Sequence, residues 1–130
     1  MMKTLDRYVD HAYAILRIVA GGLFLFHGAE KLFGVFGAAQ PSFGSQLWFA
    51  GIIEFFGGAA IMLGFGTRIA AFVASGEMAV AYFQVHWKLQ MDQSHFFPIL
   101  NKGELALLYG FLFLYIALKG PGPWSLNKRI

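Results

Sequence analysis

The chain has 130 residues, of which 58% are hydrophobic and only 13% are charged. About a quarter of the residues of an ordinary soluble domain are charged, so this composition indicates an integral membrane protein. The sequence contains no cysteine, which excludes a disulfide, a thiolate metal site and thiol chemistry by this chain. The net charge of +3 is scattered over chain ends and segment boundaries, so we predict no nucleic-acid partner.

Four apolar segments, each close to the length of a membrane-crossing helix, follow one another along the chain. Their apolar runs are continuous instead of alternating with the period of a strand, and none contains proline, so all four are predicted to be helices. We therefore expect one all-α domain over residues 1–130, built as a bundle of four transmembrane helices. The predicted spans are residues 12–34, 47–65, 69–87 and 103–119.

The distribution of Lys and Arg predicts the orientation of this bundle. Seven of these residues fall on the side of the two termini, and three fall on the side of the longer connections. Lys and Arg are enriched in cytoplasmic loops, so both termini are predicted to be cytoplasmic in a multi-pass protein. The longer connections then lie outside, together with Lys31, Lys88 and Lys102.

Ionisable side chains fall on helix faces that also carry small residues, where helices can approach closely. Glu54 and Glu77 lie in the middle of the second and third spans, and a charge at membrane depth costs about 2.5 to 3.5 kcal/mol. We predict that Glu54 pairs with Lys31 or His27, either for function or only to fix how the helices pack. Residues spaced alternately four and three apart lie on one side of a helix, and in the first span these are Arg17, Gly21, Phe24, Gly28 and Lys31.

Glu77 is expected to pair with Arg17 or Arg68, and these three residues are interpreted as structural. Nine residues separate Glu77 from His86. At about 100° per residue, that separation places the two side chains on opposite faces of an uninterrupted α-helix. We therefore expect them to share a pocket only if the helix bends.

The outward end of the bundle is predicted to carry a polar cluster suited to binding a ligand. Two histidines approach this end, and the aromatic residues of FQVHW and HFFP are placed to wall an apolar ligand site nearby. The cluster comprises His27, Lys31, Glu54, His86, Asn101 and Glu104.

Two other interpretations of these residues stay open. Asn101 followed three residues later by Glu104 has the spacing of a capping box at the start of the fourth helix. His27 and His86 could ligate a haem between facing helices, but the sequence has no haem-specific spacing, which disfavours this alternative. No metal site and no intrinsic cofactor are predicted, and motifs of hydrolases and nucleotide-binding proteins are absent.

Taken together, these residues resemble the DoxX family of small four-helix bacterial membrane proteins. The resemblance runs from LRIVAGGLFLFHGAEKLFG to the tail FFPILNKGELALLYGFLFLYIALKGPGPWSLN. One departure is Lys102, where the family commonly has glycine in an NGGE stretch, and it adds a charge beside the outward cluster. The residues specific as a set are Arg17, Gly28, Lys31, Glu54, Gly58, Gly64, Thr67, Arg68, His86, Asn101, Glu104 and the segment GPGPWSL.

The resemblance implies a location in the bacterial inner (plasma) membrane, in contact with lipids and with other membrane protein subunits. The family takes its name from association with thiosulfate:quinone oxidoreductase, and its members look like partners in redox, sulfur or oxidative-stress assemblies. We hypothesise a membrane subunit of a redox-associated complex that helps to form a quinone or lipid pocket on the extracytoplasmic side. Such a subunit is not a complete enzyme alone; if catalytic, it is part of a quinone-linked oxidoreductase.

Two alternative functions belong to different classes. The first is a non-catalytic assembly or stabilising subunit of a larger membrane complex, in which the polar residues serve only helix packing. The second is a carrier for a small molecule that uses Glu54 or Glu77 as a proton site. A carrier is disfavoured because the four segments show neither a broken helix nor an inverted repeat.

Overall fold

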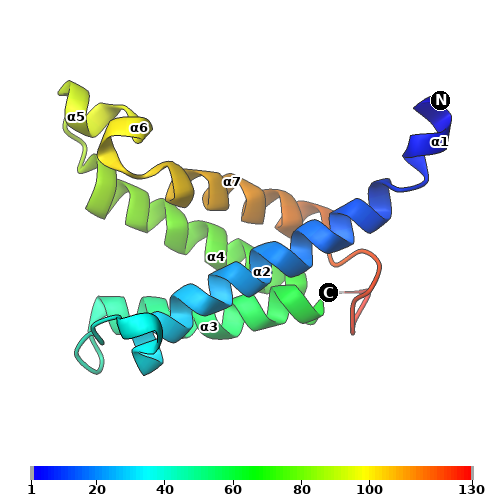
Figure 1. Ribbon diagram of the computed structural model, residues 1–130, viewed down its shortest axis with the longest axis horizontal. Helices are drawn as coiled ribbons and strands as arrows, with labels where there is room; N and C mark the ends of the chain where they lie inside the picture. Colours follow the sequence, from blue (N-terminus) through cyan, green and yellow to red (C-terminus); the bar gives the residue numbers. More distant parts are fainter. Residues whose placement is uncertain (1, 130) are drawn as a thin grey trace.

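The computed structural model describes residues 2–129, and within this range it contains helices and no β-strand. This confirms the all-α prediction, and the four long helical segments begin and end within about three residues of the predicted spans. The helical elements, of which Figure 1 labels the α-helices, are α1 (Met2–Asp6), α2 (Val9–Phe33), η1 (Val35–Gly37), α3 (Gln46–Leu63), α4 (Thr67–Ala81), η2 (Tyr82–Trp87), α5 (Gln93–Phe96), α6 (Pro98–Asn101) and α7 (Glu104–Lys119).

The helix ends follow from local sequence. Gly34 and Gly64 end α2 and α3 in the left-handed conformation, with φ of 64° and 71°, which glycine adopts without steric cost. Ser45 precedes α3 and its hydroxyl accepts a hydrogen bond from the backbone N–H of Trp48, which satisfies one of the free donors at the helix start.

The long helices form two pairs, α2 with α3 and α4 with α7 (Figure 1). The tight turn after Gly64 joins the pairs through α3 and α4. Both termini lie at one end of the molecule, whereas the long connections, residues 34–45 and 88–103, lie at the other, where the two pairs stand apart (Figure 1). Below, these are called the terminal end and the loop end.

Glycine allows α2 and α3 to pack backbone against backbone. A methyl group on Gly21 would lie 2.5 Å from the backbone nitrogen of Met62, and one on Gly58 would lie 2.5 Å from that of Leu25. A methyl on Gly28 would overlap the backbone of Phe55. These distances are too short for any side chain, so the predicted small-residue seam of the first span is confirmed.

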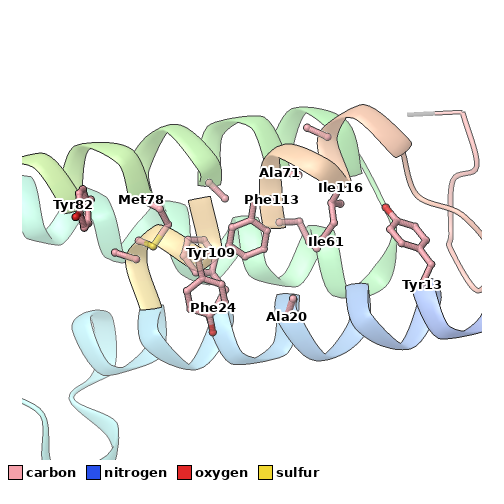
Figure 2. Packing of buried hydrophobic residues seen from close by; sticks show 13 residues of the cluster. Tyr13, Ala20, Phe24, Ile61, Ala71, Met78, Tyr82, Tyr109, Phe113 and Ile116 are labelled. Carbon is pink, nitrogen blue, oxygen red and sulfur yellow. The ribbon is translucent and has the colours of Figure 1, made fainter. Parts of the chain in front are cut away.

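An aromatic cluster fills the centre between the two pairs (Figure 2). The ring of Phe24 lies 4.7 Å from that of Phe113, which stacks in parallel on Tyr109 at 5.3 Å between ring centroids. These three side chains are buried, and they separate the interior of the loop end from that of the terminal end.

The outer surface of the long helices is apolar, while charged side chains lie inside. Phe56 of α3, Phe72 of α4 and Phe111 of α7 are each at least 60% exposed, whereas Arg17 and Glu54 are buried. A water-soluble protein does not combine so much exposed apolar surface with a charged interior. Two helices, α2 and α3, are by themselves long and apolar enough to cross a membrane; four spans and the placement of the termini stay predictions.

At the terminal end, the segment after α7 folds over Arg17. The fully buried guanidinium of Arg17 donates hydrogen bonds to the carbonyl oxygens of Ile61 at 3.1 Å and Trp124 at 2.7 Å, and also to those of Pro121 and Pro123. The tail is tied down further by hydrogen bonds from Leu126 and Asn127 to the carbonyls of Leu63 and Gly64. Arg17 and the backbone of the tail thus supply donors to carbonyls at the end of α3 and in the turns after α7.

Candidate functional site

A cavity of about 340 Å³ lies between the two helix pairs at the loop end. Its floor is formed by Phe24 and Tyr109 of the aromatic cluster, and its walls come from α2, α3, α4, η2 and α7. We call it the polar cavity, because six ionisable residues besides Tyr109 line it: His27, Lys31, Glu54, Glu77, His86 and Lys102.

Lys31 and Glu54 form an ion pair across the interface of α2 and α3. The Nζ atom of Lys31 lies 2.7 Å from Oε2 of Glu54, and only 4% of the Glu54 side chain is exposed. The pairing predicted for Glu54 is therefore confirmed with Lys31 as the partner. The close approach of the two helices at Gly28 brings the two charges together, since Gly28 contacts the backbone of Glu54 and Phe55.

The predicted pairing of Glu77 with Arg17 or Arg68 is wrong. Arg17 is occupied by the carbonyls of the terminal end, and Arg68 donates to the carbonyls of Ala117, Leu118 and Lys119 at the end of α7. Backbone carbonyls at a helix C-terminus attract a guanidinium as a carboxylate does, so they compete with Glu77 for the two arginines. The sequence does not show which carbonyls will lie near an arginine.

Glu77 lies instead beside Glu54, on the wall of the same cavity. One carboxyl oxygen of Glu77, Oε2, is buried and has no hydrogen-bond partner. Lys31 supplies one positive charge, in direct contact with Glu54 of this pair. A carboxyl oxygen without a partner at membrane depth is a candidate for binding a proton or a ligand.

A π-helix explains how Glu77 and His86 come to line the same cavity. The α-helical pattern of α4 stops at Ala81, and η2 continues the helix over Tyr82–Trp87 with π-type hydrogen bonding. A residue in a π-helix turns through a smaller angle than one in an α-helix, so His86 rotates away from the face opposite Glu77. Both side chains reach the polar cavity, which an uninterrupted α-helix would have prevented.

His27 and Tyr109 bring polar groups to the cavity from α2 and α7. Their rings meet edge to face with 6.3 Å between centroids, and the second contact of His27 is with Glu30, 3.7 Å away. Lys102 reaches the cavity from the turn before α7, where its φ of 61° is one that glycine prefers. Lys102 thus occupies a strained backbone position beside the site.

Asn101 and Glu104 do not line the polar cavity, and the capping-box interpretation is wrong. Gly103 is the N-cap of α7, and Asn101 ends α6 and accepts a hydrogen bond from the backbone of Gly103 at 2.8 Å in an Asx turn. Its carbonyl lies 3.1 Å from Nδ1 of His86, so Asn101 positions the histidine from outside. Glu104 is exposed.

The loop before Asn101 is held by a chain of hydrogen bonds. The amide of Asn101 donates to the carbonyl of His95 at 2.7 Å, and the ring of His95 lies 2.8 Å from Asp92. Hydrogen bonds from Ser94 and His95 hold the pKa of Asp92 below its usual value. This loop therefore caps the loop end without adding a charge to the polar cavity.

Sequence comparisons place the chain in a family of membrane proteins. The sequence profile of the DoxX family matches residues 12–87, which is more than half of the chain. The chain belongs to the DoxX family. It is 31% identical to the inner membrane protein YqjF of Escherichia coli K12, with 99% of this chain and 97% of that protein aligned.

A second relative is a protein of Haemophilus influenzae Rd described as uncharacterized. It is 40% identical to this DoxX-family protein over 98% of this chain and 97% of its own length. The comparison with solved structures gave no match. The family and the inner membrane relative, together with the apolar outer surface, establish a membrane location.

Sequence reasoning about this DoxX-family protein found four cavity residues and missed others. His27, Lys31, Glu54 and His86 were predicted to cluster and do line one cavity. Glu77 was assigned to the wrong partner, and Tyr109 was not recognised as a cavity residue. A tyrosine in the middle of an apolar span was the available signal, because its hydroxyl needs a polar partner at that depth.

Proposed function

We propose that this DoxX-family protein is a membrane subunit of a redox-associated complex and that its polar cavity binds a quinone head group. The observation that carries the proposal is the Lys31–Glu54–Glu77 triad in a cavity with an aromatic floor, in which Glu54 is buried and one buried carboxyl oxygen of Glu77 has no partner. An apolar cavity with a few convergent polar groups is the usual form of a site for a small ligand.

The residues of the cavity fit the chemistry of a quinone. A quinone ring is flat and apolar, its two carbonyl oxygens accept hydrogen bonds, and its reduction consumes two electrons and two protons. Lys31, His27 and Tyr109 are potential donors to such oxygens, and the Glu54–Glu77 pair would store and deliver a proton. The chain has no cysteine, so the proposal assigns the electrons to a partner subunit.

The proposed function requires a particular location and orientation of the protein in the membrane. We place the protein in the bacterial inner membrane with four spans and cytoplasmic termini, so that the polar cavity opens toward the extracytoplasmic side. The name of the Escherichia coli relative, the exposed apolar surface and the excess of Lys and Arg at the terminal end support this arrangement.

Native purification in mild detergent, followed by extraction of small molecules and identification of copurifying proteins, tests the proposal. We expect a retained quinone and a complex larger than the single chain. In that complex, Glu54→Gln should lower quinone-linked turnover by about a hundredfold while assembly persists, as expected for a lost proton-transfer group. A monomer without quinone, or unchanged turnover of the assembled variant, would contradict the proposal.

Glu104→Gln is the matched control for this experiment. Glu104 is an exposed carboxylate at the same end of the molecule but outside the cavity. Its replacement should leave turnover unchanged, because no described contact links it to the triad.

Of the alternatives, an assembly subunit is favoured by one observation, the breadth of the exposed aromatic surface, which fits protein neighbours as well as lipid. The same purification distinguishes the two functions. A large complex without quinone, whose activity tolerates Glu54→Gln, supports the assembly role.

The cluster of Phe24, Tyr109 and Phe113 argues against a carrier, because it fills the interior between the two ends of the molecule.

A further inference from the structure

An apolar groove of about 440 Å³ runs between α3 and α4 on the outer surface of the helix pairs. Its walls include small side chains, Ala50 on α3 and Gly76 on α4, with Ile53, Val73 and Val80 beside them. A methyl group on Gly76 would meet no atom within 4 Å, so the groove is open there. We call this the α3–α4 groove.

The α3–α4 groove adjoins the polar cavity along one wall. Leu47, Glu77, Ala81 and Val85 line both spaces. Glu77, whose Oε2 atom has no partner, therefore lies at the boundary between the polar interior and an apolar outer face. A carboxyl oxygen buried without a partner at such a boundary is costly in an isolated protein, and a ligand that crosses the boundary would give it a partner.

A hydrogen bond bridges the two helices at the loop end of this groove. Nε2 of Gln46, the first residue of α3, donates to Oε1 of Gln84 in η2 at 2.7 Å. Both residues line the groove and both are exposed. One weak bond between exposed side chains is easily exchanged, so it can open and reform as a ligand passes.

A second groove, of about 450 Å³, lies between α4 and α7, but it is separated from the polar cavity. The two spaces share only Met78 and Ala106 as lining residues, and both are apolar and at least nine-tenths buried. Three aromatic residues of FQVHW and HFFP line this groove: Phe83, Trp87 and Phe96. It offers no polar residue of the triad.

We propose that the α3–α4 groove holds the apolar tail of a lipid-tailed quinone whose head group lies in the polar cavity, and that this ligand enters sideways from the membrane between α3 and α4. The inference rests on the proposed function of the cavity. The cavity has room for a ring but not for a long tail, and an apolar tail stays in an apolar groove because moving it past the polar loops would expose it to water.

Three glycine-to-leucine variants test the path. Gly76→Leu fills the α3–α4 groove, Gly110→Leu fills the α4–α7 groove, and Gly57→Leu adds the same side chain at a helical glycine with open space and no groove. Leucine is a better helix former than glycine, so all three variants should fold. Binding of a tailless benzoquinone and of one with a long isoprenoid tail is measured in lipid nanodiscs.

We expect Gly76→Leu to weaken binding of the long-tailed quinone by about tenfold or more and to leave binding of the tailless quinone unchanged. Gly57→Leu and Gly110→Leu should match the wild type with both probes. A loss caused by Gly110→Leu instead of Gly76→Leu, or equal binding by all variants, would overturn the lateral path while the cavity proposal stands. Failure of the wild type to bind either quinone would overturn both.

A photoreactive group on the tail supplies an independent readout. With wild-type protein, crosslinks should map to peptides containing Ile53, Val73 or Val80 of the α3–α4 groove. Crosslinks to Phe111 or Leu114, which line the α4–α7 groove, would overturn the proposed path.

Discussion

The two ends of the helix pairs differ in how their interior charged side chains are paired. At the terminal end, the guanidinium of Arg17 is fully buried and its hydrogen bonds go to four backbone carbonyls. At the loop end, Lys31 pairs with Glu54, one carboxyl oxygen of the neighbouring Glu77 is unpartnered, and a cavity lies beside them.

This difference indicates that Arg17 has a structural role and that Glu77 is a candidate functional residue. Arg17 binds the tail after α7 to the end of α3, and its side chain is fully buried among these carbonyls. Glu77 contributes no ion pair with an arginine and leaves a polar group unsatisfied at a cost of about 1 to 3 kcal/mol. Such a cost is retained where a ligand or a proton compensates for it.

The largest expected effect is at the terminal end. Arg17→Met removes the donor from four backbone carbonyls, and we expect the free energy of unfolding to fall by about 3 to 5 kcal/mol. Unfolding of the purified protein in mild detergent measures this change. The exposed Arg7→Met serves as control and should change stability by less than about 0.5 kcal/mol. A loss below about 1 kcal/mol for Arg17→Met would show that water replaces the guanidinium.

At the loop end, two isosteric substitutions should have different effects. Glu54→Gln leaves the ammonium of Lys31 without its carboxylate, so stability should fall by about 1 to 3 kcal/mol. Glu77→Gln removes a carboxyl group that has no cationic partner and introduces an amide donor toward Glu54, so we expect a change within about 1 kcal/mol or a gain. The same detergent unfolding assay applies. Equal losses in both variants would refute the distinction between a paired and an unpaired carboxyl group.

The smallest expected effect concerns the strained turn beside the cavity. Lys102→Gly places glycine at a φ of 61°, where it carries no steric cost, and should raise stability by about 0.5 to 1 kcal/mol. Lys128→Gly, an exposed lysine near the end of the chain, is the control and should give no gain. Thermal melts of the two variants side by side provide the comparison, and a loss of stability in Lys102→Gly would mean that the Lys102 ammonium stabilises the triad.

The helices and the Lys31–Glu54 pair were predictable because they depend on local rules. Continuous apolar runs without proline predicted the four long helices, and glycines such as Gly34 and Gly64 marked their ends. The spacing of Gly21 and Gly28 on one face indicated which side of α2 another helix would contact. A carboxylate at that contact then required a nearby cation, and Lys31 was on the same face.

Only the tertiary structure decided the partners of Arg17, Glu77 and His86. Backbone carbonyls carry no mark in a sequence, so the capture of Arg17 by the tail after α7 could not be foreseen. The change from α to π hydrogen bonding at Tyr82 depends on packing against neighbouring segments, and it brings His86 to the cavity of Glu77. Which segments form helices, and which residues share one helix face, follows from residues close together in the sequence. Which of several distant acceptors binds a given side chain is decided only when the helices pack.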